Sequence, residues 1–162
     1  MTDLLAAIEA SSFSTWLRES NSIWAYPTVL TLHTLGLAVL VGANVAFDLR
    51  LLDFGTSLTL EDLRPLFRAM WIGFWVNAIS GAMLLAADAT TKAAAPMFLI
   101  KLALVAVGVA FIILTRRVVY RAGSTNTVTT AAKALATGSL AVWLIAIAAG
   151  RLMAYPGLFF GL

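Results

Sequence analysis

The chain has 162 residues, of which 61% are hydrophobic and only 12% are charged, and its mean hydropathy is +0.93. Soluble domains carry about 25% charged residues, so this composition excludes an ordinary water-soluble domain and indicates an integral membrane protein. The sequence has no cysteine, which excludes disulfides, thiolate zinc sites and iron–sulfur clusters. The net charge of +3 is interpreted as a membrane-topology signal and not as a nucleic-acid-binding surface.

Residues 3–18 are predicted to form one short amphipathic helix at the membrane interface. Their apolar positions roughly follow helical spacing, with Asp3, Glu9 and Arg18 among them. The start is acidic, and no apolar stretch precedes a small-residue cleavage site, so a cleavable signal peptide is not expected. The first membrane span is therefore expected to act as the targeting signal.

Four apolar segments follow, each long enough to cross a hydrocarbon core of about 30 Å as a helix. We predict an all-α fold, a bundle of four transmembrane helices, in which residues 1–162 form a single integral membrane domain. In the loop after the first span, the segment from Thr59 to Asp62 resembles a helix N-terminal cap. The predicted spans are residues 24–47, 69–87, 96–115 and 134–155.

Basic residues predict the orientation of these spans. The loops between spans one and two and between spans three and four carry seven basic residues, and the opposite side carries four. Because cytoplasmic loops are enriched in basic residues, we expect a bacterial inner-membrane protein with both termini in the periplasm. The seven are Arg50, Arg64, Arg68, Arg116, Arg117, Arg121 and Lys133, and the four are Arg18, Lys92, Lys101 and Arg151.

Small residues recur at four-residue spacing in three of the spans. Such stripes allow helices to approach closely, and Asn77 can form a hydrogen bond across the contact. The stripes are expected to build the bundle within one chain, and an oligomer or a partner subunit is the alternative. They comprise Ala38 and Gly42 in span one, Ala69, Gly73, Asn77 and Gly81 in span two, and Ala134, Gly138, Ala146 and Gly150 in span four.

His33 is the only histidine and lies about ten residues into span one, roughly 15 Å deep. Lys101, Arg151 and Met83 are expected in the same outer half of the bundle. This set could bind haem b, with His33 on the iron and a cation near the propionates, a quinone bonded to His33, or a lipid headgroup. The alternative is a structural histidine that bonds a neighbouring helix, with Lys101 and Arg151 extending to the surface.

Several site classes are poorly supported. A haem would lack a second histidine, and would need Met83 or another methionine, a five-coordinate iron, or a ligand from another chain. The five methionines form no clear copper-binding array. No carboxylate is expected in mid-membrane, which argues against a proton relay, and no hydrolase or ATPase motif is present. Asp48 and Arg50 are expected to anchor the end of span one at the interface, or to form an ion pair.

The motifs HTLGLAVLVG, DLRLLDFG, ISGAMLL and FLIKLAL resemble a family of uncharacterised small bacterial inner-membrane proteins. The chain is also distantly similar to the membrane part of copper-resistance D-type proteins, which are cytochrome b561-like in architecture. These resemblances imply a four-helix bundle in redox surroundings, without an established activity. The matching positions are His33, Gly36, Asp48, Arg50, Gly55, Ser80, Gly81 and Lys101.

Our first functional hypothesis is a non-catalytic membrane subunit or anchor of a larger redox complex that holds lipid or quinone near His33. The alternative is a small b-type cytochrome that passes electrons between a periplasmic donor and quinone, with His33 as haem ligand. A copper-handling protein is a third hypothesis. The expected partners are the lipid bilayer and either other membrane proteins or further copies of this chain, without nucleic acid.

Overall fold

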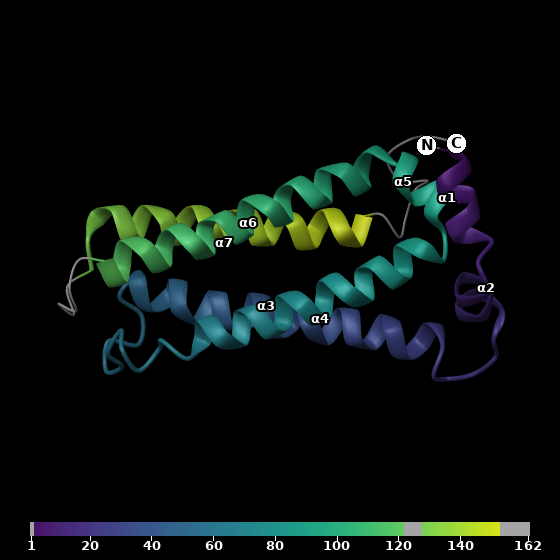
Figure 1. The fold of residues 1–162 in the computed structure, drawn as a ribbon. Coiled ribbons are helices and arrows are strands. Elements are labelled where there is room, and N and C mark those ends of the chain that lie inside the picture. Colours follow the sequence, from purple (N-terminus) through teal and green to yellow (C-terminus); the bar gives the residue numbers. More distant parts are fainter. Residues whose placement is uncertain (1, 122–127, 153–162) are drawn as a thin grey trace. The chain divides into compact units, whose positions relative to one another are not determined.

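The computed structural model describes residues 2–121 and 128–152, and all regular elements in these ranges are helices (Figure 1). This confirms the predicted all-α class. The helices are α1 (Thr2–Glu9), α2 (Ser12–Glu19), α3 (Tyr26–Leu51), α4 (Leu66–Ala86), α5 (Ala89–Ala94), α6 (Pro96–Arg121) and α7 (Thr130–Leu152).

Four of these helices, α3, α4, α6 and α7, are long and apolar enough to cross a membrane. They have 26, 21, 26 and 23 residues, which at 1.5 Å per residue exceeds a hydrocarbon core of about 30 Å. The chain is therefore a multi-pass membrane protein by the length and composition of its helices.

The observed helices extend past several predicted span ends. Helix α3 continues to Leu51 and α6 to Arg121, whereas the predicted spans stopped before the first arginines. Charged residues end an apolar segment, but arginine has a high helix propensity and does not interrupt the backbone hydrogen bonds. Helix α7 begins at Thr130, and the last three residues of the predicted fourth span lie outside the described residues.

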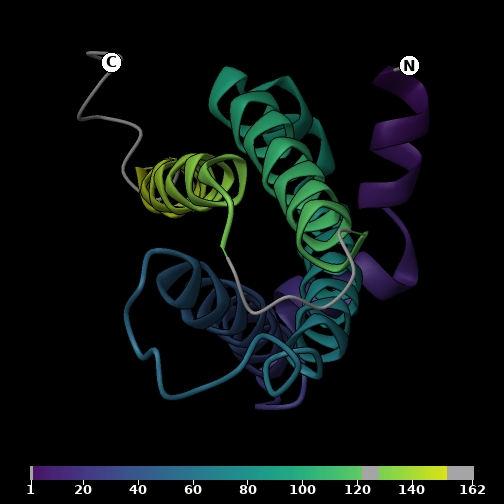
Figure 2. The same cartoon turned by 90° about the vertical axis from the view of Figure 1, so that its left-hand side faces the viewer.

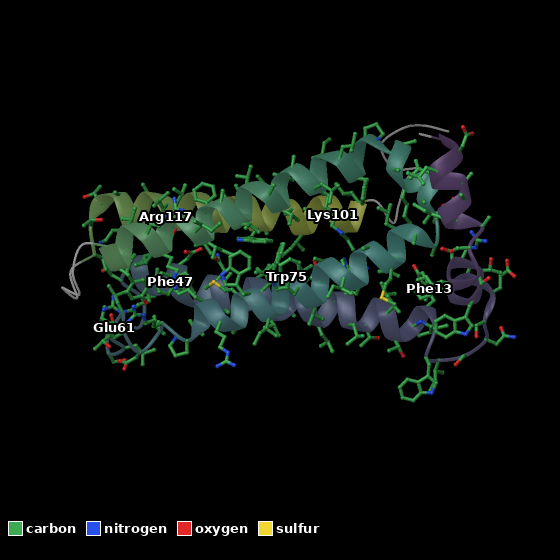
Figure 3. All side chains as sticks on the ribbon, in the orientation of Figure 1. Phe13, Phe47, Glu61, Trp75, Lys101 and Arg117 are labelled. Atoms are coloured by element: carbon green, nitrogen blue, oxygen red, sulfur yellow. The ribbon has the colours of Figure 1, made fainter. Side chains whose placement is uncertain are left out.

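The prediction of one N-terminal helix is wrong, because residues 2–19 form two helices separated at Ala10 and Ser11. Ser11 has an extended backbone, and its hydroxyl accepts a hydrogen bond from the Ser14 amide at 3.3 Å. This is the geometry of a helix N-cap, which starts a new helix and excludes continuation of the preceding one. Phe13 and Trp16 of α2 remain exposed (Phe13 is labelled in Figure 3).

The two N-terminal helices are held against the end of α4 and the start of α5. The Ser14 hydroxyl donates to the Ala86 carbonyl at 3.0 Å, and Arg18 donates to the Ala87 carbonyl at 3.1 Å. Glu9 accepts hydrogen bonds from the amide and the hydroxyl of Thr90, at 2.8 and 2.6 Å. The carbonyls of the last residue of α4 and of the residue after it thus accept hydrogen bonds from side chains about 70 residues earlier in the chain.

The chain divides into two compact units. The first contains α1, α2, α3 as far as Gly42, α4 from Ala69, and α5. The second contains the rest of α3, the loop that follows it, α6 and α7. Figure 2 shows α6 and α7 of the second unit as neighbours, and the two helices pack extensively against each other. Their ridges meet where Gly108 lies under the Trp143 ring and Gly138 under the Phe111 ring.

The loop after α3 contains the predicted cap. Thr59 and Asp62 exchange hydrogen bonds, from the Thr59 amide to the carboxylate at 2.9 Å and from the Asp62 amide to the Thr59 hydroxyl at 3.2 Å. These reciprocal bonds are those of a capping box, but they enclose a turn, and α4 begins only at Leu66. The bonds from Thr59 hold the pKa of Asp62 below its ordinary value.

Candidate functional site

The candidate site lies in the first unit, where α3 and α4 touch through backbone. A Cβ on Gly36 would lie 2.6 Å from the Asn77 nitrogen, and a Cβ on Gly73 would lie 2.6 Å from the Leu40 nitrogen. The predicted small-residue stripe of α4 is therefore a helix contact within the chain. On α3 the expected contact within the chain is made by Gly36 and not by Gly42, where an added Cβ would meet no atom within 4 Å.

His33 lies one turn before Gly36 and bonds directly to α4. Its Nδ1 is 2.9 Å from the Asn77 carbonyl oxygen and 3.3 Å from the Ser80 hydroxyl. In return, the Asn77 side-chain amide donates to the His33 carbonyl at 2.7 Å. The imidazole lies over Gly81, where an added Cβ would be 2.9 Å from Cε1. Each helix thus satisfies a backbone carbonyl of the other, which fixes their register.

These bonds determine the tautomer of the neutral histidine. A carbonyl oxygen only accepts, so Nδ1 carries the hydrogen that bonds to Asn77. The Ser80 hydroxyl donates its hydrogen to the Val76 carbonyl at 2.6 Å, so its oxygen can only accept a hydrogen bond from Nδ1. The Nε2 atom of neutral His33 is consequently a hydrogen-bond acceptor and a potential metal ligand. The ring is half-buried in the described chain.

The other predicted site residues lie on different elements. Met83 is half-buried and packs against the apolar cluster of Leu17, Ala25, Val29 and Ala87, in the same unit as His33. Lys101 and Arg151 belong to the second unit, on the first two turns of α6 and the last turn of α7 (Lys101 is labelled in Figure 3). The Lys101 side chain lies alongside Gly150, with its Nζ 3.6 Å from the position of an added Cβ.

A buried polar cluster in the second unit was not predicted. Asp48 is only 1% exposed, although the sequence suggested an anchor at the interface. Asn44, one turn earlier, donates to the Asp48 carboxylate at 2.6 Å and to the Ser139 hydroxyl of α7 at 2.8 Å. Arg50 does not pair with Asp48 but donates to the Leu58 carbonyl at 2.7 Å. The sequence signal was the i, i+4 spacing of Asn44 and Asp48, which places both on one face of α3.

The described residues contain no group of three or more histidine, aspartate or glutamate side chains able to hold a metal ion. Comparison of the chain with protein-family models, curated proteins and solved structures finds no match.

Proposed function

We propose that the chain is a non-catalytic subunit or anchor of a larger redox complex in the bacterial inner membrane, and that it binds a quinol at His33. The observation that carries the proposal is the hydrogen bond from His33 Nδ1 to the Asn77 carbonyl. The short connections between the spanning helices, of which the longest described runs from residue 52 to residue 65, also favour a role within the membrane.

The tautomer of His33 favours a quinol over a quinone as the ligand. Neutral His33 uses its one N–H towards Asn77, so Nε2 can accept a hydrogen bond but cannot donate one. A quinol offers a phenolic hydroxyl as donor, whereas a quinone offers only carbonyl acceptors. In apolar surroundings a hydrogen bond from a quinol hydroxyl to Nε2 is stronger than the same bond would be in water.

The experiment compares ligand and partners in two variants. In His33→Asn the shorter side chain keeps a donor near the position of Nδ1 and removes Nε2. The protein is purified in mild detergent, and bound quinol and co-purifying chains are measured by mass. We expect the variant to keep its partner chains and to lose quinol about tenfold, which corresponds to the loss of one hydrogen bond in a desolvated site.

Gly42→Ala is the matched control, because its added methyl meets no atom within 4 Å. It is expected to retain both quinol and partners. Equal quinol in the wild type and in His33→Asn would reject the quinol site, and purification without any specific partner chain would reject the subunit role.

The same hydrogen bond favours a second candidate, a small b-type cytochrome. Histidines that bind metals commonly donate their other ring N–H to a backbone carbonyl, which orients the ring and raises its basicity. His33 could in this way hold a haem iron through Nε2, and a bound haem would supply one-electron transfer. Oxidised and dithionite-reduced absorption spectra test this function. A stoichiometric haem band that is lost in His33→Asn supports it, and a colourless wild-type protein rejects it.

We also propose that both termini are periplasmic, on the strength of the basic residues in the two opposite loops. The cysteine-free sequence permits a direct test with single cysteines. Asn21→Cys, before α3, should react with a membrane-impermeant thiol reagent in intact spheroplasts, and Ser57→Cys, in the loop after α3, should react only after lysis. The reverse pattern would invert the orientation.

A further inference from the structure

We infer that a small monovalent cation such as sodium binds in the second unit, between the buried polar cluster of Asn44, Asp48 and Ser139 and the buried hydroxyl of Thr115. This inference is independent of the quinol proposal, because it concerns a different helix contact and different residues.

The first observation is an acidic side chain without a basic partner. Asp48 is almost fully buried, and the ion pairs of the described residues do not include it. Its side-chain hydrogen bonds come from neutral groups, of which the Asn44 amide at 2.6 Å is the closest. A buried carboxylate in a membrane protein is costly unless its charge is compensated. A single monovalent cation would balance this single carboxylate.

The second observation is Thr115, whose buried hydroxyl has no hydrogen-bond partner. Thr31, Thr34 and Thr137 lie in helices too, and each donates its hydroxyl to the carbonyl four residues earlier, at 2.8 to 3.1 Å. The Thr115 hydroxyl could donate in the same way to the carbonyl four residues earlier in α6, but it does not form this hydrogen bond. A buried hydroxyl without a hydrogen-bond partner lowers the stability of the fold. The Thr115 oxygen would avoid this cost by coordinating a bound cation.

Helix register brings Thr115 and Asp48 to the same level. Phe111 lies against Gly138, so Thr115, four residues further along α6, is opposite residues about four positions earlier in α7. Asn44 bonds to Ser139, so Asp48, four residues further along α3, is opposite the same turn of α7.

That turn of α7 contains Ala136, which is completely buried and has a side chain of only one methyl group. Ser139 extends from the next turn of the same buried face. Asp48 of α3, Thr115 of α6 and Ser139 of α7 are all buried, and in the proposed site their oxygens meet beside this small side chain.

Asn44 holds two of these oxygens in place. Its single amide nitrogen bonds both the carboxylate of Asp48 and the hydroxyl of Ser139, so both oxygens lie within about one hydrogen-bond length of one atom. Carboxylate and hydroxyl oxygens are hard donors that suit hard cations and not soft transition metals. The cluster thus offers one negative charge and at least three oxygens, arranged by a neutral amide.

The test is thermal unfolding of the whole protein in mild detergent at constant ionic strength, in sodium chloride, potassium chloride or choline chloride. We expect the alkali cation to raise Tm by about 4 °C over choline at ten times the dissociation constant. Asp48→Asn should remove this difference, and in choline it should unfold no earlier than the wild type, because it no longer buries a charge. Retention of the cation effect in Asp48→Asn would overturn the site.

Thr115→Val removes the hydroxyl at nearly constant volume and should weaken the cation effect. Thr137→Val is the matched control, since its exposed hydroxyl bonds to its own helix, and should leave the effect unchanged. Equal Tm values in all three salts for the wild type would overturn the proposal. A Tm that depends on pH and not on the cation would also overturn it, because the Asp48 carboxylate would then be neutralised by a proton.

Discussion

Gly36→Ala tests whether the close approach of α3 and α4 holds the His33 site together. Its Cβ would lie 2.6 Å from the Asn77 nitrogen and 3.0 Å from the Gly73 carbonyl oxygen, both backbone atoms. Ordinary contact begins at 3.4 Å, so the helices must separate by about 0.8 Å. The same movement would lengthen the 2.9 Å bond from His33 to the Asn77 carbonyl beyond hydrogen-bonding distance.

The expected loss of stability is about 1–3 kcal/mol. Overpacking costs about 1–3 kcal/mol and each interhelical hydrogen bond in a membrane contributes about 0.6 kcal/mol, against a gain of up to about 1 kcal/mol from helix propensity. Unfolding in a denaturing-detergent titration measures the difference. Gly42→Ala on the same helix is the control and should unfold no earlier than the wild type. If both variants unfolded alike, the proposed role of the glycine contact would be wrong.

Two further predictions concern the histidine ring and the N-terminal helices. In Gly81→Ala the new methyl group displaces the imidazole and should weaken its hydrogen bond. NMR of isotope-labelled histidine reports only His33 and should show the N–H on Nδ1 in the wild type and a weakened hydrogen bond in the variant. An N–H on Nε2 in the wild type would contradict the tautomer. The hydroxyl and amide of Thr90 hold the pKa of Glu9 below its usual 4.5. The bond therefore stabilises docking fully above pH 4.5, and this contribution is lost as the pH falls through the lowered folded-state pKa. Hydrogen exchange of the Thr90 amide should follow that loss, and Glu9→Gln should remove the dependence on pH.

The sequence predicted the membrane spans well because they depend on the length of apolar segments, which is a one-dimensional property. It also predicted which face of α4 forms a contact, since Gly73, Asn77 and Gly81 repeat at four-residue spacing. It did not predict that Gly36 is their partner. Spacing defines a face on each helix, but the pairing of two faces depends on tilt and rotation, which only packing determines.

The burial of Asp48 shows a second limit of the sequence. A charged residue near the end of an apolar segment is expected at the interface, and the helix was predicted to end before it. The backbone continues to Leu51, so Asp48 is a full helical position with Asn44 one turn away on the same face. The serine that completes the cluster is 95 positions from Asn44 in the chain, a separation that local pattern analysis does not bridge.

The N-terminal helices also constrain how this protein is made. Ser14 and Arg18 bond carbonyls at the end of α4, so α2 cannot reach its final position until two membrane spans have been synthesised and inserted. Two crossings return the chain to the side on which it started, which is the condition for these bonds to form. The N-terminal segment can therefore dock only when the hairpin of α3 and α4 is complete, so that protection of Ser14 would report correct insertion of these two helices.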